Sequence, residues 1–384
     1  MAIKKMEDLQ VKNKTVLVRV DYNVPVQADQ ITDDSRIQAS LPTLRYLLDQ
    51  GCGVTLMSHF GRPKGVDQEN SLARVARHLA EILGRDVPLV GLDAGPAALG
   101  SVQLLENLRF EPGETKNDRA LAERLAHFGS VYINDAFGAA HRAHASIEAV
   151  THFFAEKGAG FLMQREVHYL REALREPERP YVAILGGSKV SDKLGLIRNL
   201  MPKVDALLIG GAMSYTFLKA LGVPVGKSRV EADLVDEARA IIQECQAHGP
   251  QLVLPKDHMV AQTFDENAKA TITLNESIDE ASMGLDIGPE TIQTFTAVIK
   301  SAKTVVWNGP MGVFEWDTFS TGTITVAEAV ASCAGLTVIG GGDSVAAAAM
   351  AGVSEQIDHI STGGGAALEL LSGLELPGIR ALED

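Results

Sequence analysis

The sequence predicts an α/β fold with two doubly wound parallel-sheet domains. Short apolar, β-branched runs alternate with longer segments of helical period along the whole chain, which is the pattern of parallel strands joined by helices. The strand-like runs are apolar throughout rather than alternating with polar residues, as expected when helices cover both faces of a sheet. The chain of 384 residues is long enough to form two sizeable cores.

The individual elements follow from local periodicity. The expected strands are short runs rich in Val, Ile, Leu and Thr, and they lie at residues 15–20, 53–58, 102–105, 131–134, 181–185, 206–209, 251–254, 304–307 and 337–340. The expected helices repeat apolar residues three and four apart, and they lie at residues 37–49, 72–83, 119–128, 165–175, 190–201, 215–221, 232–248, 290–300, 323–333 and 345–351.

A domain boundary is expected near residue 170. Histidines concentrate before this point and glycines after it. The helix expected at residues 165–175 is followed by the segment Glu-Pro-Glu-Arg-Pro, whose prolines end the helix and stiffen the chain. We therefore expect a first domain over residues 1–170 and a second domain that begins at residue 171.

Composition excludes several classes of protein. The net charge of −14 argues against sequence-independent nucleic-acid binding and against binding to anionic membranes. No apolar run is long enough to span a bilayer, and the start of the chain does not resemble a signal peptide. The three cysteines, Cys52, Cys245 and Cys333, lie far apart and indicate neither a disulfide framework nor a zinc motif. A reducing, cytoplasmic location is expected.

Four glycine-rich turns in the second half follow one plan, an apolar strand, then Gly-Gly, then a helix. They lie at residues 184–189, 208–213, 338–344 and 360–366. One such turn alone is more often a tight connection, but several at successive strand ends, one with Lys189 and another with Asp343, indicate a nucleotide phosphate site.

Charged residues near these turns suggest specific roles. Lys189 and Lys193 lie four residues apart at the start of an expected helix and would share one face, with Lys189 reaching phosphate oxygens. Asp343 suits Mg²⁺, which takes one or two protein carboxylates, although an Asp at this position can also be a helix N-cap. Glu315 either holds a ribose or is an ordinary surface carboxylate.

The usual nucleotide motifs are absent. No G-x-G-x-x-G occurs, so a nicotinamide dehydrogenase lacks its fingerprint. Residues 222–228 (GVPVGKS) look like a P-loop but are one residue short and follow an expected helix instead of a strand. We therefore interpret this segment as a loop.

The first half places polar and basic residues after several expected strands. They are Asp21, Asn23, Arg36, His59, Arg62, Arg109 and Arg142. If those strands belong to one sheet, the arginines converge, and guanidinium groups suit carboxylate and phosphate. We expect a pocket for a small, multiply charged anion. His141 and His144 have no third ligand nearby, and the arginine between them argues against zinc.

At this point the motifs resemble those of the phosphoglycerate kinase family. The matching segments are RVDYNVP at 19–25, SHFGRP at 58–63, ENLR at 106–109, DAFGAAHRAH at 135–144, the Lys189/Lys193 turn, WNGPMGVFE at 307–315, GGGD at 340–343 and STGGGAALE at 361–369. They span the whole chain in one order. Phe60 and Ser188 depart from the commoner family residues but are not charged site residues.

The resemblance implies two Rossmann-like domains that face each other across a cleft and are joined by a hinge helix, with residues 368–384 packing back on the first domain. The first domain would bind 3-phosphoglycerate through Asp21, Asn23, Arg36, His59, Arg62, Arg109 and Arg142. The second, at 171–367, would bind ADP or ATP through Lys189, Lys193, Gly211, Gly284, Leu285, Asn308, Glu315, Gly340, Gly341, Gly342, Asp343 and Ser344, with Asp343 on Mg²⁺. A monomer is implied.

The implied reaction is reversible phosphoryl transfer between 1,3-bisphosphoglycerate and ADP, giving 3-phosphoglycerate and ATP. The acceptor carboxylate is ionised at neutral pH, so no general base is needed. Alignment and charge neutralisation remain, and we assign them to Arg36, Lys189, Gly342 and Gly365, with domain closure excluding water. The alternative is a non-catalytic nucleotide- or anion-binding regulator, although it would more often have lost Lys189 or Arg36.

Overall fold

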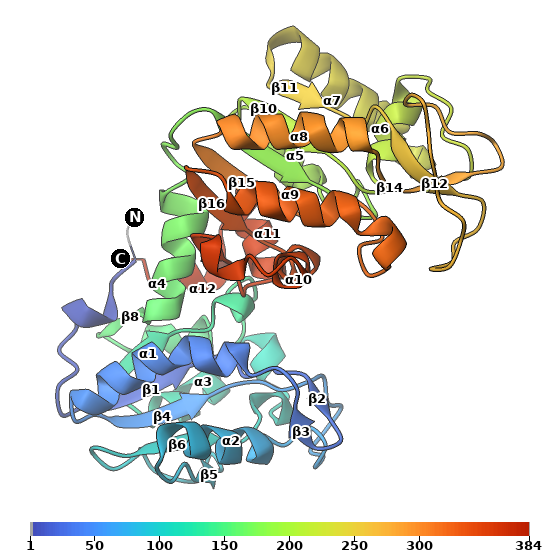
Figure 1. The fold of residues 1–384 in the computed structure, drawn as a ribbon. Coiled ribbons are helices and arrows are strands. Elements are labelled where there is room, and N and C mark those ends of the chain that lie inside the picture. Colours follow the sequence, from blue (N-terminus) through green and yellow to red (C-terminus); the bar gives the residue numbers. More distant parts are fainter. Residues whose placement is uncertain (1–2, 384) are drawn as a thin grey trace. The chain divides into compact units, whose positions relative to one another are not determined.

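The computed structural model describes residues 3–383 and divides the chain into two compact units (Figure 1). Unit 1 contains the chain up to His168 together with the segment from Glu375 onward, and unit 2 is Tyr169–Leu374. The C-terminal segment that rejoins unit 1 therefore begins at Glu375, later than the expected residue 368. The reason is that helix α11 (Gly365–Leu371) belongs to unit 2, where Asn199 Nδ2 donates to Leu371 O at 2.5 Å.

Unit 1 is built on a six-stranded sheet in which every strand pair is parallel. The order is β5 (Leu89–Val90), β6 (Val102–Leu105), β4 (Gly53–Met57), β1 (Thr15–Arg19), β7 (Val131–Asn134) and β8 (Lys157–Ala159). In the register of the central strands, Val18 pairs with Leu56 on one side and with Ile133 on the other. The expected parallel sheet is confirmed.

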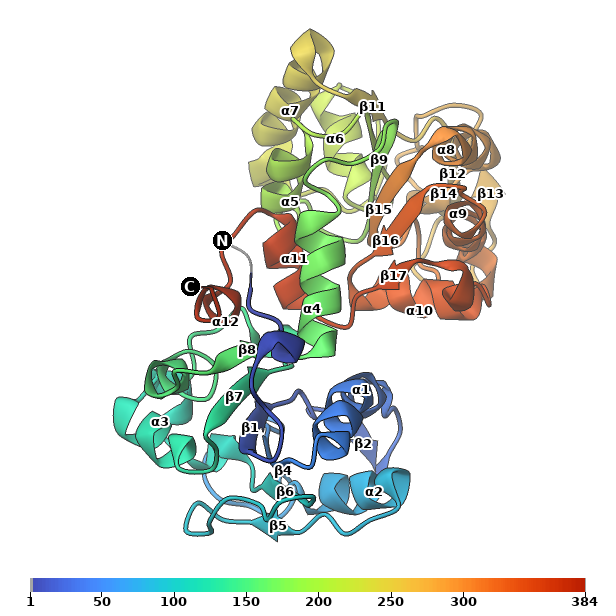
Figure 2. The same cartoon turned by 90° about the vertical axis from the view of Figure 1, so that its left-hand side faces the viewer.

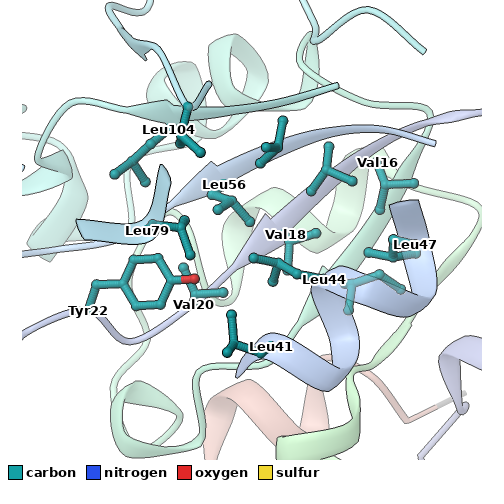
Figure 3. Close-up of a cluster of buried hydrophobic side chains, with 14 of the residues drawn as sticks. Val16, Val18, Val20, Tyr22, Leu41, Leu44, Leu47, Leu56, Leu79 and Leu104 are labelled. Carbon is teal, nitrogen blue, oxygen red and sulfur yellow. The ribbon is translucent and has the colours of Figure 1, made fainter. Parts of the chain in front are cut away.

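Helices cover both faces of this sheet. Helices α1 (Ser35–Asp49) and α2 (Ala73–Leu83) lie on one face and α3 (Arg119–Ala126) on the other (Figure 2). Alternate residues of β1, such as Val16 and Val18, point toward Leu44 and Leu47 of α1 in the core (Figure 3). Truncating such a buried leucine to alanine typically costs about 2–5 kcal/mol. The short helix α12 (Pro377–Arg380) completes the unit.

Unit 2 contains a second six-stranded parallel sheet. Its order is β11 (Gln251–Val253), β10 (Ala206–Ile209), β9 (Tyr181–Leu185), β15 (Thr304–Asn308), β16 (Leu336–Ile339) and β17 (His359–Ile360). One face carries α5 (Leu194–Leu200), α6 (Ser214–Ala220) and α7 (Val235–His248), and the other carries α8 (Pro289–Ser301), α9 (Thr321–Ala331) and α10 (Gly342–Met350) (Figure 2). Both units are thus doubly wound.

Two small antiparallel elements were not expected. A hairpin joins β2 (Val26–Gln27) and β3 (Gln30–Ile31), and a three-stranded sheet has the order β13 (Thr271–Ile272), β12 (His258–Ala261) and β14 (Met283–Ile287). Strands of two residues carry no periodicity, and the sequence Met-Gly-Leu-Asp-Ile of β14 contains two residues that are depleted in strands.

Four helices begin three or more residues from their expected starts, and one of them is α7, expected from residue 232, which begins at Val235. The helix expected at 165–175 is α4 (Phe161–Val167), which continues into a π-helical turn, His168–Glu172. Its start is fixed by Asp135 Oδ1, which accepts from the Met163 N–H at 3.1 Å. The helix expected at 190–201 starts only at α5, and the one expected at 345–351 is α10, which starts three residues earlier.

Candidate functional site

The carboxyl edge of the unit 1 sheet gathers the expected anion-binding residues. The adjacent strands β6, β4, β1 and β7 are followed by Arg109, by His59 and Arg62, by Asp21 and Asn23, and by Arg142, and Arg36 lies in the first turn of α1. The condition for their convergence, one common sheet, is met. Ligands of open parallel sheets bind outside this edge.

Hydrogen bonds join the loops that follow β1 and β4. Arg36 Nη1 donates to Asp21 Oδ2 at 3.2 Å and to Asn23 O at 3.0 Å. Asn23 Oδ1 accepts from the Gly61 N–H at 2.9 Å. Burial raises the pKa of Asp21, but His59, Arg36 and Arg19 outweigh this effect and lower the pKa overall. The carboxylate is therefore ionised and holds Arg36 in place.

Three arginines at this edge have no ion pair among the residues that the structure describes. They are Arg62, Arg109 and Arg142. The Nε of Arg109 is buried and has no hydrogen-bond partner within residues 3–383. Burial lowers the pKa of Arg109, and the positive charge of Arg142 lowers it further. Like charges held near one another without an ion-pair partner favour an anionic ligand.

Arg19 was not among the expected site residues, although it lies beneath them. It is the last residue of β1 and is fully buried. Its Nε donates to Ser146 Oγ at 2.8 Å, and its Nη2 lies 3.1 Å from His59 Nδ1. Because a guanidinium can only donate, His59 Nδ1 accepts and the ring proton is on Nε2. Burial lowers the pKa of His59, so the ring is neutral at pH 7.

Glu114 is fully buried as well, and its carboxyl group interacts electrostatically with Arg19. Its carboxylate accepts from the Ser146 N–H at 3.0 Å and from Ser146 Oγ at 2.6 Å. Burial raises the pKa of Glu114, while Arg19 opposes that shift. Burial and then the charges of Arg19, Arg109 and Arg142 lower the pKa of His144 to about 4. A charged residue inside the otherwise apolar run 15–20 was the available sequence signal.

The carboxyl edge of the unit 2 sheet gathers the glycine-rich turns. The adjacent strands β10, β9, β15, β16 and β17 are followed in turn by Gly211, by Lys189, by the loop after Asn308, by Gly340–Ser344 and by residues 361–365. Backbone hydrogen bonds connect these turns to one another. The Gly187 N–H donates to Pro310 O at 2.8 Å, and the Gly211 N–H donates to Met311 O at 3.0 Å.

Gly211 is required by this close approach. It has a φ of 65°, in the left-handed region that favours glycine. A Cβ at this position would lie only 2.6 Å from the Gly187 nitrogen and 2.7 Å from Pro310 O. The tight backbone contact between the turns after β9 and β10 therefore excludes any side chain here.

The two lysines have different surroundings. Lys193 is half-buried, and its Nζ donates to Asn308 Oδ1. Burial lowers the pKa of Lys193, and Asp192 and Asp343 oppose that shift. Lys189 is exposed and lies in a loop. The expectation that both share one helical face is wrong, because α5 begins only at Leu194.

The turn after β16 presents a helix start together with an unsatisfied donor. Asn308 is buried and its Nδ2 has no partner within the described residues, 3.2 Å from where a Cβ on Gly341 would lie. Ser344 Oγ accepts from the Gly309 N–H at 2.6 Å. Asp343 lies exposed in the first turn of α10, and Gly341 is the N-cap residue, so the N-cap interpretation of Asp343 is wrong.

The candidate metal site in unit 2 offers one carboxylate, that of Asp343. Among residues 3–383 no group of three or more His, Cys, Asp and Glu side chains lies close enough to hold a metal ion. Mg²⁺ commonly keeps several waters and binds through one or two carboxylates plus substrate phosphates. The exposed Asp343 fits that requirement, since the remaining ligands would come from phosphates and water.

None of the described helices has the length and apolar character needed to cross a membrane.

The remaining expected residues lie beside this edge, on other elements. Gly284 and Leu285 belong to β14, in the small antiparallel sheet. Leu285 O accepts from the Val313 N–H at 2.8 Å, which brings β14 against the loop that carries the exposed Glu315. Gly365 is the first residue of α11, so its amide is among the free donors of that helix start.

Comparisons with known proteins agree over the full length. The family profile described as phosphoglycerate kinase matches residues 6–374. The phosphoglycerate kinase of Moorella thermoacetica is 53% identical, with 100% of each chain covered, and that of Nitratiruptor sp. is 50% identical, with 100% of this chain and 99% of the relative covered. The solved phosphoglycerate kinase structure from Coxiella burnetii has a TM-score of 0.95 at 41% identity, with 99% of each chain covered. That from Pyrococcus horikoshii has a TM-score of 0.84 at 33% identity, with 98% of each chain covered.

Proposed function

The chain belongs to the phosphoglycerate kinase family, and from this premise we infer that it catalyses reversible transfer of a phosphoryl group from 1,3-bisphosphoglycerate to ADP, giving 3-phosphoglycerate and ATP. The carboxyl edges of the two sheets suit the two reactants of such a transfer. One edge concentrates guanidinium groups, and the other concentrates glycine-rich turns at helix starts. No observation favours the non-catalytic alternative.

Unit 1 is the proposed binding site of the phosphoglycerates. The residues are Asp21, Asn23, Arg36, His59, Arg62, Arg109 and Arg142. The observation that carries this assignment is the set of three arginines without an ion pair, one of which has a buried donor without a partner. Guanidinium groups can bind carboxylate or phosphate through two parallel hydrogen bonds.

Unit 2 is the proposed binding site of the nucleotide. The residues are Lys189, Lys193, Gly211, Gly284, Leu285, Asn308, Glu315, Gly340, Gly341, Gly342, Asp343 and Ser344. Support comes from the free amides at the start of α10 and from the unsatisfied Nδ2 of Asn308. Helix starts of this kind favour phosphate. Asp343 would hold Mg²⁺, which when bound neutralises phosphate charge.

The proposed catalytic groups align the reactants and neutralise charge. The acceptor carboxylate is ionised at pH 7, so transfer to it needs no general base. Arg36, held by the ionised Asp21, orients the substrate carboxyl group. Lys189 and the amides of Gly342 and Gly365 stabilise the charge on the transferring oxygens.

Arg36 belongs to unit 1 and Lys189 to unit 2, so catalysis needs both units. The chain crosses between them inside the continuous helical stretch formed by α4 and the π-helical turn His168–Glu172. We assign the hinge to this stretch, and closure about it excludes water from the reacting groups. We also propose that the protein is monomeric and cytoplasmic.

A coupled assay tests the reaction and the role of Lys189. ATP, Mg²⁺ and 3-phosphoglycerate are supplied, and the bisphosphoglycerate formed is read as NADH oxidation by a dehydrogenase. Activity is expected to require 3-phosphoglycerate, and Lys189→Ala is expected to lower kcat about 100-fold. Lys300→Ala, which removes an exposed lysine at the end of α8, is the matched control. Full activity of Lys189→Ala would contradict the assignment.

A further inference from the structure

The segment that resembles a P-loop has another role in the structure. Residues 226–231, which we name the clamp segment, run past β14 and toward the turn after β9. The Lys227 N–H donates to Ser282 O at 2.8 Å, and Gly226 has a φ of 52°, where a Cβ would lie 2.1 Å from Asp279 O. The segment is therefore fixed along the strand that carries Gly284.

Ser228 reaches a proposed nucleotide-binding residue directly. Its Oγ accepts a hydrogen bond from the Gly284 N–H at 3.0 Å. Gly284 itself cannot carry a side chain, since a Cβ would lie 2.0 Å from the Tyr215 hydroxyl oxygen. The backbone of β14 at this point is held between Ser228 and Tyr215.

Glu231, at the other end of the clamp segment, reaches the loop that carries Lys189. Its carboxylate accepts from the Val190 N–H, from the Ser191 N–H at 3.2 Å and from Ser191 Oγ at 2.6 Å. The Val190 N–H belongs to the peptide bond that directly follows Lys189. These three bonds hold the backbone of the loop at the residue assigned to transition-state stabilisation.

Glu231 is suited to this contact by its own anchoring and charge. Its N–H donates to the buried Thr216 Oγ1 of α6 at 3.1 Å. Burial raises the pKa of Glu231, but the hydrogen bonds from Ser191 and Val190 outweigh it and lower the pKa overall. The carboxylate is ionised at neutral pH, and hydrogen bonds to an ionised acceptor are stronger than neutral ones.

The Lys189 side chain has no hydrogen bond or ion pair within the described part of the chain. Its placement therefore depends on the loop backbone, and the loop depends on Glu231. We propose that Glu231 is a positioning residue for Lys189, and that Ser228 is a positioning residue for Gly284. The clamp segment thus positions two parts of the proposed nucleotide site, the loop that carries Lys189 and the strand that carries Gly284. This inference rests on the proposed function of unit 2.

The test compares Glu231→Ala and Glu231→Asp with Asp233→Ala, which removes an exposed carboxylate two residues farther along. Glu231→Ala is expected to lower kcat at least about tenfold, because a displaced catalytic group loses much of its effect. The KM for 3-phosphoglycerate is expected to stay unchanged, since that site lies in unit 1. Glu231→Asp should recover part of kcat, and Asp233→Ala should match the parent protein.

A double-mutant cycle separates positioning from general loosening of the fold. In the Lys189→Ala background, Glu231→Ala is expected to cause no further loss of kcat, because the group it positions is gone. A full additional loss in that background would overturn the proposal, and so would an unchanged kcat in Glu231→Ala alone. If Lys189→Ala itself leaves kcat unchanged, the proposed function of Lys189 has failed, independently of Glu231.

Ser228→Ala tests the other end of the clamp segment. Removing the acceptor of the Gly284 N–H is expected to raise the KM for ATP about threefold with little change in kcat. An unchanged KM for ATP would remove Ser228 from the proposal. Thermal unfolding of each variant is measured alongside, so that a fall in kcat without a matching fall in Tm identifies positioning.

Discussion

The two units place their proposed site residues at equivalent edges of similar sheets, yet the interactions that support those edges differ. In unit 1 the edge rests on fully buried charged side chains, Arg19 and Glu114, joined through Ser146. In unit 2 it rests on backbone turns bonded to one another, such as Gly187 to Pro310, with Lys189 left exposed. Under the proposed assignment, fixed charges would position the phosphoglycerate and backbone geometry would position the nucleotide.

This difference predicts different sensitivities. A buried charge that loses its partner is strongly destabilising, so unit 1 should respond to charge substitutions through its stability. A turn that requires positive φ does not tolerate a side chain, so unit 2 should respond to substitutions of single glycines.

The largest expected effect is that of Arg19→Leu. It leaves Glu114 buried without the positive charge of Arg19 and should lower the free energy of unfolding of unit 1 by about 3–5 kcal/mol. Urea unfolding, followed by a probe in each unit, measures this change. The double variant with Glu114→Gln should recover part of the loss. If unit 2 lost as much stability as unit 1, the contrast between the units would fail.

The next effect concerns one buried carboxylate in each unit. Burial raises the pKa of Asp286 in unit 2 to about 7 and that of Asp135 in unit 1 to about 6. Their native states bind a proton more tightly than the unfolded chain does, so this stability is present below about pH 4 and is lost as pH rises through the native pKa. Asp286 should contribute to unit 2 a loss of up to about 1.4 kcal/mol per pH unit between pH 4 and 7.

Asp286→Asn checks the sign of this dependence. The variant should flatten the pH dependence of unit 2 unfolding over that window, while unit 1 keeps its own, which ends near pH 6. Urea midpoints at several pH values provide the measurement. A pH dependence of unit 2 unfolding that is the same in Asp286→Asn as in the parent protein would contradict the raised pKa of Asp286.

A smaller effect separates two neighbouring glycines of unit 2. Gly341 has a φ of 93°, whereas a Cβ on Gly342 would meet nothing within 4 Å. Gly341→Ala should therefore lower the free energy of unfolding by about 1–3 kcal/mol. Gly342→Ala, inside α10, should leave it unchanged or raise it by up to about 1 kcal/mol. Equal effects of the two substitutions would mean that backbone conformation does not govern this turn.

The sequence predicted those parts of the molecule that local patterns determine. The strands at 102–105 and 131–134 match residue for residue, because each is a short apolar run with clear turn residues around it. The strand-end positions of Arg62, Arg109 and Lys189 followed from the same alternation. Local patterns did not reveal contacts between residues that are far apart in the sequence. Glu231 holds the loop at Val190, so α5 starts later than its periodicity suggested.

The buried network under the anion site was missed for the same physical reason. Arg19, Glu114 and Ser146 come from three distant segments, and only the fold shows that they bond to one another. A charged residue in an apolar strand signals that a partner exists but does not say which residue it is. The start of α4 likewise depends on Asp135, which lies at the end of another strand.

Calorimetric binding to the Arg142→Ala variant tests the division of labour between the units most directly. Removing one of the arginines that lack an ion pair should weaken 3-phosphoglycerate binding about tenfold or more, with the Kd for ADP unchanged. Lys300→Ala serves as the control for loss of one positive charge. A Kd for 3-phosphoglycerate equal to that of the parent protein, or an equal weakening of ADP binding, would contradict the assignment of the two ligands to separate units.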